Sequence, residues 1–220
     1  MTPFGYCERD STLFWAEPLN ALTNGAFIVA AVMAQLLWRR AGGRDWPAAL
    51  LIALVFCIGI GSFLFHTMPG RATLLADVIP IQLFAFGYFG LALRRLLRLS
   101  LTASLIGTLA FLGFALALQV GLAPLLPQGA RGSAGYGAFV IGLFGVGLGL
   151  RAGHPEQTGS AGLLLAGVLF AVSLTLRSLD AGWCAQLPFG LHWAWHLLNA
   201  GVLCLLLRAA IGSQSRPAPG

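Results

Sequence analysis

Apolar stretches of about twenty residues alternate with short polar or basic breaks along almost the whole chain. A run of about 18 or more apolar residues with few charges is long enough to cross the hydrocarbon core of a bilayer as a helix. Seven such stretches occur, over about 16–38, 46–66, 73–93, 101–123, 134–150, 160–176 and 189–211. The pattern predicts an all-α fold, in which seven transmembrane helices form one bundle and one domain over residues 1–211.

Both ends of the chain are polar. Residues 1–16 form a short acidic segment. A cleaved signal peptide begins with basic residues that are followed by a short apolar core, and this segment lacks that pattern, so we do not expect one. Residues 212–220 read GSQSRPAPG, and a segment so poor in apolar side chains is expected to be disordered. Neither end predicts a second domain.

The composition excludes a soluble protein. Charged residues make up 9% of the chain and hydrophobic residues 58%, whereas a soluble domain has roughly 25% charged residues. The net charge of +6 comes from thirteen arginines and no lysine. Because these arginines lie between the apolar stretches, they indicate membrane topology rather than nucleic-acid binding.

The arginines divide unevenly between the two sides of a seven-helix bundle. Four lie on the side of the N-terminus and nine on the opposite side. The positive-inside rule therefore predicts an outer N-terminus and a cytosolic C-terminus. A chain rich in alanine and proline and free of lysine is typical of bacteria with GC-rich genomes, so we expect the bacterial inner membrane with the outer side facing the periplasm. Five of the seven acidic residues are predicted at or near that side, namely Glu8, Asp10, Glu17, Asp77 and Asp180.

Three histidines are predicted at the same depth of the outer half. His192 and His196 are four residues apart on one helix, so both rings share a face. That spacing suits two ligands of one zinc ion, although by itself it more often marks packed or interfacial histidines. His66, near the outer end of another helix, supplies a third imidazole. Three imidazoles leave a fourth zinc position open for water, which is the pattern of a catalytic rather than a structural site.

Ser62 and Asp77 are predicted beside these histidines. Ser62 precedes His66 by one helical turn. Its hydroxyl either bonds back to its own helix or points toward the water on the metal or a developing oxyanion. Asp77 begins the next helix, where a carboxylate needs a partner. We interpret it as the general base that activates water and then as the acid that protonates the leaving group.

The acidic N-terminal segment allows two interpretations. Glu8, Asp10 and Glu17, followed by Asn20 and Asn24, can simply be a solvated segment. Alternatively, hard oxygen ligands so close together are those that a calcium ion needs. The two asparagines share a helical face and can instead bond to neighbouring helices.

Two pairings are predicted on the outer side. Cys7 and Cys184 both lie there, where oxidation is permitted, and we expect a disulfide that ties the N-terminal segment to the loop before the last helix. Arg177 and Asp180 are three residues apart at the end of the sixth stretch, and we expect a local ion pair.

Three blocks of the sequence resemble the alkaline ceramidases, part of a superfamily of seven-helix membrane hydrolases that also contains the adiponectin-receptor-like proteins. The first block, YCERD followed by EPLNALTN, resembles the family pattern W-C-E-x-N and E-x-x-N-T-x-S-N. The second, GIGSFLFHTMPGRATLLADVIP, has the serine, histidine and aspartate of the family at the family's spacing. The third, LHWAWHLLNA, resembles H-x-x-W-H-L-L.

This resemblance implies a function and a set of site residues. It implies zinc held by His66, His192 and His196, with Ser62 and Asp77 in the catalytic roles given above. It further implies a calcium ion near Glu8, Asp10 and Glu17, and a disulfide between Cys7 and Cys184.

The expected activity is that of a zinc-dependent intramembrane amidase. It would hydrolyse the N-acyl bond of ceramide or a related membrane lipid to a fatty acid and a sphingoid base. Two alternatives stay open, a receptor of the adiponectin-receptor or haemolysin-III type and a hydrolase of another acyl lipid. A lipid-sized cavity beside the metal favours hydrolysis, whereas a closed four-ligand site favours the receptor.

Overall fold

The computed structural model describes residues 6–153 and 159–214, and no strand occurs among them. The helices in chain order are α1 (Pro18–Thr23), α2 (Gly25–Arg40), α3 (Trp46–Thr67), α4 (Arg71–Arg95), α5 (Leu101–Leu122), α6 (Gly137–Gly153), α7 (Gly159–Trp183) and α8 (His192–Gln214). Two short 3-10 helices, η1 (Ala123–Leu125) and η2 (Gln128–Ser133), connect α5 to α6. Most of the predicted tail, from position 215, lies outside the described residues.

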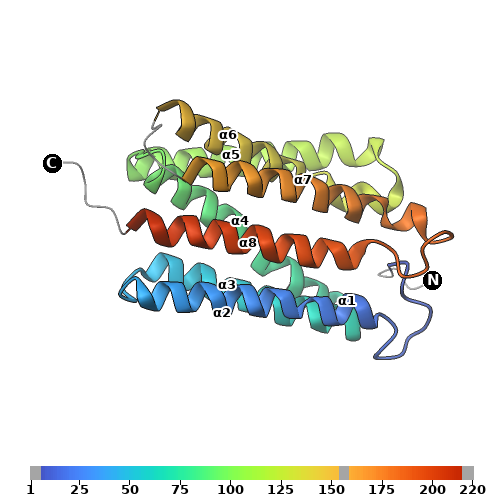
Figure 1. Ribbon diagram of the computed structural model, residues 1–220. Coiled ribbons are helices and arrows are strands. Elements are labelled where there is room, and N and C mark those ends of the chain that lie inside the picture. Colours follow the sequence, from blue (N-terminus) through green and yellow to red (C-terminus); the bar gives the residue numbers. More distant parts are fainter. Residues whose placement is uncertain (1–5, 154–158, 215–220) are drawn as a thin grey trace.

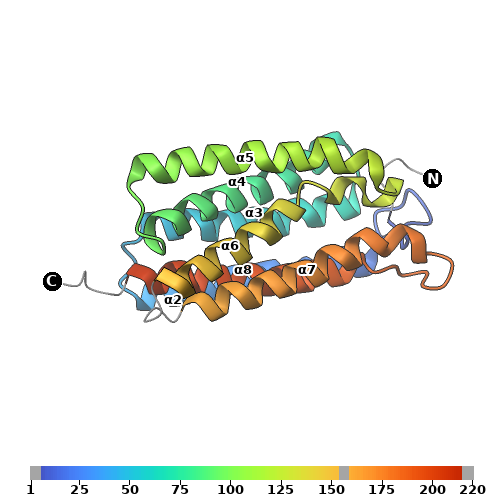
Figure 2. The same cartoon turned by 90° about the horizontal axis from the view of Figure 1, so that it is seen from above.

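Seven spans in the described part of the chain are long and apolar enough to cross a membrane, with α1 and α2 forming the first and η2 and α6 the fifth. The predicted all-α bundle is therefore confirmed. Figure 1 shows the long helices lying lengthwise beside one another, with α8 between the α2–α3 pair and the α5–α7 group. Seen from above in Figure 2, α5 lies at one edge of the bundle.

The sixth apolar stretch differs most from its prediction. It was expected to end near residue 176, but α7 continues to Trp183. Arg177 and Asp180 follow the predicted end of this stretch. In the longer helix Arg177 is partly exposed and Asp180 is buried. The Arg177 guanidinium donates a hydrogen bond to Ser133, and the Asp180 carboxylate accepts one from the Leu191 amide. Polar residues whose hydrogen bonds are satisfied inside the bundle do not end a helix.

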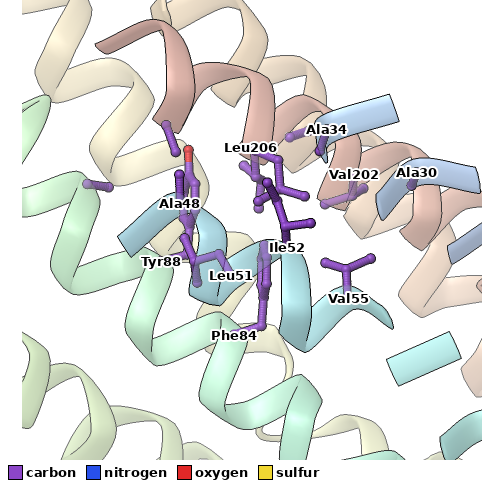
Figure 3. Packing of buried hydrophobic residues seen from close by; sticks show 14 of the residues in the cluster. Ala30, Ala34, Ala48, Leu51, Ile52, Val55, Phe84, Tyr88, Val202 and Leu206 are labelled. Atoms are coloured by element: carbon purple, nitrogen blue, oxygen red, sulfur yellow. The ribbon is translucent and has the colours of Figure 1, made fainter. Parts of the chain in front are cut away.

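The core of the bundle is apolar. Figure 3 shows small side chains of α2 against branched and aromatic side chains of α3, α4 and α8. The labelled residues include Ala30, Ala34, Ile52, Val55, Phe84 and Leu206, each less than 7% exposed. Alanines on α2 let the neighbouring helices approach closely, as small residues do in membrane bundles.

An ion pair joins two helices at the end of the bundle opposite the histidines. Asp45 caps α3 by accepting a hydrogen bond from the Ala48 amide at 3.3 Å. Both Asp45 carboxylate oxygens also accept from Arg95 at the end of α4, each at 2.7 Å. A bidentate pair of this kind fixes geometry as well as adding energy. It therefore holds the start of α3 against the end of α4.

At the other end of the bundle, α3 and α4 touch at Gly61. A Cβ atom added there would lie 2.1 Å from the Ala76 carbonyl oxygen and 3.0 Å from the Asp77 amide nitrogen. Only glycine permits this backbone contact. The contact sets Ser62 and Asp77, the residues next to it, on facing helices.

Gly61→Ala is expected to force the two helices apart. Overpacking of this kind costs roughly 2–3 kcal/mol, which lowers the melting temperature in detergent by roughly 5–10 °C. Gly145→Ala is the matched control, because nothing lies within 4 Å of a Cβ added on α6. Equal melting temperatures for the two variants would contradict the close approach at Gly61.

Candidate metal centre

Three buried histidines meet at one end of the bundle. His66 lies at the end of α3, and His192 and His196 lie in the first turns of α8. One ring nitrogen of each histidine lies within 4.8 Å of a ring nitrogen of each of the other two. The rings are 1–3% exposed. The predicted convergence of two distant parts of the chain is therefore confirmed.

The free nitrogen atoms of this cluster are the strongest sign of a metal. His66 Nε2, His196 Nε2 and His192 Nδ1 are buried and have no hydrogen-bond partner among the described residues. A buried polar atom without a partner destabilises a protein by about 1–3 kcal/mol. Three such atoms in one place suit a cation that prefers imidazole, as zinc does. These residues therefore fit a metal of this kind.

Two neighbouring side chains orient the rings. Glu17 Oε2 lies 2.5 Å from His66 Nδ1, and Thr23 Oγ1 lies 2.9 Å from His196 Nδ1. The Thr23 hydroxyl donates its own proton to a carbonyl of α1, so it accepts from His196. With the proton of the His66 and His196 rings on Nδ1, the lone pair of Nε2 in these two rings is free for a metal. Carboxylates and hydroxyls commonly fix metal-ligating histidines in this way.

Glu17 is well suited to accept that proton. Burial acts to raise the pKa of Glu17, but the hydrogen bonds from His66 and Arg9 outweigh it and hold the pKa below its ordinary value. The carboxylate is therefore ionised at neutral pH and accepts hydrogen bonds with both oxygens.

Glu17→Gln is expected to weaken zinc binding about 10- to 100-fold without removing a ligand. Side chains that hydrogen-bond to a metal-ligating histidine typically contribute a factor of this size to metal affinity. The amide can donate to His66 Nδ1 and so favour the wrong tautomer. Zinc titration of the metal-free protein measures the change. Glu8→Gln is the control, since the hydrogen bonds of the Glu8 side chain within residues 6–153 and 159–214 go to backbone amides of α1. An unchanged zinc affinity for Glu17→Gln would contradict the orienting role.

Ser62 and Asp77 lie beside the histidines, as the Gly61 contact requires. Ser62 is 3% exposed and forms a side-chain hydrogen bond with Asp77. Asp77 Oδ1 is buried and has no partner among the described residues. It also interacts electrostatically with His66 and Arg177. A carboxylate with one free oxygen next to the histidine cluster has the freedom to accept a proton there.

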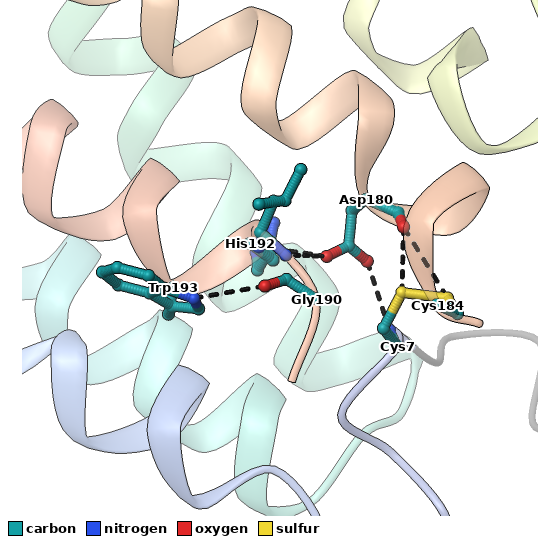
Figure 4. The surroundings of a disulfide bond; sticks show 7 residues. Cys7, Asp180, Cys184, Gly190, His192 and Trp193 are labelled. Carbon is teal, nitrogen blue, oxygen red and sulfur yellow. Dashed lines mark hydrogen bonds between the residues drawn. A yellow bond between two sulfur atoms is a disulfide. The ribbon is translucent and has the colours of Figure 1, made fainter. Parts of the chain in front are cut away.

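Asp180 and the predicted disulfide fix the start of α8. The Cys7–Cys184 disulfide is present. Figure 4 shows Asp180 between it and His192. Asp180 Oδ2 accepts from the Cys7 amide at 3.2 Å, and Oδ1 accepts from the amides of Leu191 and His192 at 2.6 and 3.0 Å. Asp180 thus caps α8 and holds the N-terminal segment against it.

The ion pair predicted between Arg177 and Asp180 is therefore wrong. It is not among the ion pairs of the described residues, because three backbone amides already occupy the carboxylate. The Arg177 guanidinium instead donates to Ser133 Oγ at 2.6 Å and lies over the rings of Tyr136 and Trp195, 5.6 and 5.3 Å from their centroids. Aromatic faces are favourable partners for a buried arginine.

Tyr6 is a site residue that the sequence did not reveal. Its ring stacks on His192 with 3.5 Å between the centroids, and its phenol bonds to Arg177. Burial raises the pKa of Tyr6 to about 12, so the phenol keeps its proton. Its place directly before Cys7 was the one available signal, because the disulfide draws this segment over the histidines.

The acidic residues expected to bind calcium do not gather around one point. Among the described residues, the histidines form the one group of three metal-binding side chains whose donor atoms converge. Both Glu8 oxygens accept from the first amides of α1, those of Leu19 and Asn20, at 2.7 and 2.8 Å. Both Glu17 oxygens are also occupied, and Asp10 is exposed. In the described part of the chain, the carboxylates of Glu8, Asp10 and Glu17 therefore do not form a shared calcium site.

An apolar cavity lies among the helices close to His196. Its volume is about 90 Å³. Side chains of every helix from α2 to α8 line it. Near the metal centre the lining includes Phe27, whose ring lies 6.2 Å from that of His196, together with Trp195 and Asn199. Farther along the bundle it includes Ala92 and Leu206.

Comparison with known proteins adds no assignment to this geometry. No protein-family model matches the chain. No curated protein matches its sequence either. The function proposed below rests on the residues and on their arrangement.

Proposed function

We propose that this protein is a zinc-dependent intramembrane amidase. Its substrate is ceramide or a related N-acyl lipid, and its products are a fatty acid and a sphingoid base. The observation that carries the proposal is the group of three buried, partnerless histidine nitrogens beside a carboxylate that has one free oxygen. Perturbed or unsatisfied polar groups that converge in an apolar setting are characteristic of catalytic centres.

The metal site consists of His66, His192 and His196. A zinc ion held by these side chains would supply Lewis acidity and a nucleophile derived from water at neutral pH. Three protein ligands leave a position for water or substrate, as hydrolytic zinc sites require. Glu17 and Thr23 keep the ligand nitrogens of His66 and His196 unprotonated on the metal side.

Asp77 is the proton carrier of the reaction. Its free oxygen accepts a proton from the attacking water, whose oxygen forms the new bond to the amide carbon. The C–N bond then breaks, and Asp77 returns the proton to the leaving amine. Ser62, hydrogen-bonded to Asp77 in the free protein, can turn its hydroxyl to donate to the developing oxyanion. Water is consumed, and the fatty acid and the amine are released.

The cavity accommodates the acyl chain. Its lining runs along α8 from Trp195 to Leu206, a length of about 16 Å at 1.5 Å per residue. An apolar cavity that begins at neighbours of His196 and extends this far along α8 suits part of a hydrocarbon chain whose carbonyl would lie near the histidines. A receptor with a closed structural metal site needs no such cavity, so the cavity favours hydrolysis over the receptor alternative.

We further propose that the histidine end of the bundle faces the periplasm across a bacterial inner membrane. Two observations support this orientation. Among the described residues, eight arginines lie toward the other end of the bundle, against four at this end. The Cys7–Cys184 disulfide lies at the histidine end, and disulfides persist in oxidising compartments.

The test is hydrolysis by purified protein. Wild-type protein in detergent micelles is analysed for zinc by mass spectrometry and incubated with ceramide, and the released fatty acid is quantified. One zinc per chain together with fatty-acid release supports the proposal. Bound zinc without release from ceramide or any other N-acyl lipid supports the receptor instead, and the absence of stoichiometric zinc refutes both.

A further inference from the structure

The Arg9 side chain is buried against Glu17, one of the three acidic residues that were interpreted as possible calcium ligands. Its side chain is 2% exposed, and that of Glu17, its partner, is 1% exposed. Arg9 Nε bonds to Glu17 Oε1. One terminal nitrogen donates to the Ser11 carbonyl at 3.3 Å and the other to the His66 carbonyl at 2.6 Å. A fully buried arginine with three oxygen partners has a defined structural task.

These partners come from three different parts of the chain. Ser11 belongs to the N-terminal segment, Glu17 is the residue before α1, and His66 lies at the end of α3. A carboxylate oxygen together with backbone carbonyl oxygens is the kind of ligand set that holds calcium in proteins. Here one guanidinium binds all three oxygens. It leaves no place for a metal ion between them.

Arg9 also acts on the histidine cluster. Glu17 uses one oxygen for Arg9 and the other for His66 Nδ1. The guanidinium therefore fixes the carboxylate that fixes the ring, and its bond to the His66 carbonyl holds the backbone of the same residue. Without a cation here, the buried Glu17 charge would lack compensation on this side.

We propose that Arg9 is a built-in cation that takes the structural place of a calcium ion and positions His66 through Glu17. The protein is accordingly calcium-independent, in contrast to the calcium-binding interpretation of the acidic segment. Arg9 is a positioning residue, since it touches neither the metal nor the substrate. The proposal concerns the assembly of the histidine site and deepens the proposed function, but its first readout does not depend on catalysis.

The first experiment measures the melting temperature of wild-type protein. Buffer freed of calcium by a chelating resin is compared with buffer containing millimolar calcium chloride, and magnesium chloride serves as the ionic-strength control. The expected result is the same melting temperature in calcium and magnesium. A rise specific to calcium would overturn the proposal, because it would reveal a calcium site that Arg9 does not replace.

The second experiment removes the guanidinium. In Arg9→Ser the three oxygens face an empty space, so the protein is expected to melt at a lower temperature and to become responsive to calcium. Calcium at about 100 times its dissociation constant should raise the melting temperature by roughly 5–10 °C. The control is Arg71→Ser, which removes an exposed arginine at the start of α4 and should show no calcium response. A loss of stability in Arg9→Ser that calcium does not restore would overturn the proposal.

Zinc affinity provides the readout that a purely structural role would not change. Without calcium, Arg9→Ser should bind zinc about tenfold or more weakly than wild type, and calcium should restore the affinity. Arg9→Lys keeps the positive charge, so it should retain near wild-type zinc affinity and remain unresponsive to calcium. If Arg9→Ser cannot be purified, the zinc affinity of Arg9→Lys and the calcium response of the wild-type protein still test the proposal. The role of Arg9 would be refuted if Arg9→Lys bound zinc as weakly as a variant that lacks a zinc ligand. A calcium response of the wild-type protein would refute it as well. Absence of hydrolysis would refute only the proposed amidase activity.

Discussion

His196→Ala is expected to abolish stoichiometric zinc binding and, with it, the release of fatty acid. The imidazole supplies one of three converging nitrogens, and the two that remain cannot hold zinc at submicromolar concentration. Loss of a direct ligand should cost more than the 10- to 100-fold that loss of an orienting partner costs. The zinc content per chain should fall from about one to near zero, and hydrolysis should fall at least as far.

The measurement needs a control for damage to the fold. Leu197→Ala changes the neighbouring residue of α8, whose side chain is 43% exposed and points away from the cluster, so it should keep full zinc and activity. Chelation of zinc from wild type should lower its melting temperature to near that of His196→Ala, because the metal stabilises only the folded state. If His196→Ala keeps one zinc per chain, the cluster is not the metal site.

The fold and the core of the site were predictable because each depends on a strong local pattern. Long apolar stretches separated by arginines predict spanning helices with little ambiguity. Once seven helices are counted, His66 and the pair on α8 must lie at the same end, and the structure brings them within reach of one metal. The disulfide followed from the same count, since Cys7 and Cys184 both fall at that end.

What the sequence did not predict depends on side-chain contacts between distant residues. Asp180 is three residues from Arg177, but it bonds to amides of Cys7, Leu191 and His192. Only the folded chain brings these amides together. Arg177 for its part lies over the rings of Tyr136, just before α6, and of Trp195 on α8. Sequence spacing favours the local ion pair, and tertiary hydrogen bonds overrule it.

The acidic segment illustrates the same limit. Glu8, Asp10 and Glu17 look like one group of ligands because they are close in sequence. Their carboxylates have separate tasks in three dimensions, since Glu8 caps α1 and Glu17 orients His66. Arg9, the basic residue between them, is the cation that binds Glu17. Composition within a short segment therefore indicates charge, but it does not indicate which charges share a site.

Asp77→Asn is expected to separate metal binding from catalysis. Asparagine has the size of aspartate and can still accept the hydrogen bond of Ser62, but it cannot take a proton from water. General acid–base groups contribute about 10²- to 10⁴-fold to rate. The turnover number should fall by that factor, whereas the Michaelis constant and the zinc content should stay near the wild-type values.

The control for Asp77→Asn is Asp45→Asn, at the opposite end of the bundle. It loses the ion pair with Arg95, so its melting temperature should fall while its turnover number stays unchanged. Loss of zinc from Asp77→Asn would mean that Asp77 is a metal ligand rather than the proton carrier. Full activity with bound zinc would mean that another group carries the proton. The free oxygen of Asp77, buried next to three partnerless histidine nitrogens, favours the loss of turnover with retention of zinc, because a carboxylate placed there can serve the reaction without serving as a ligand.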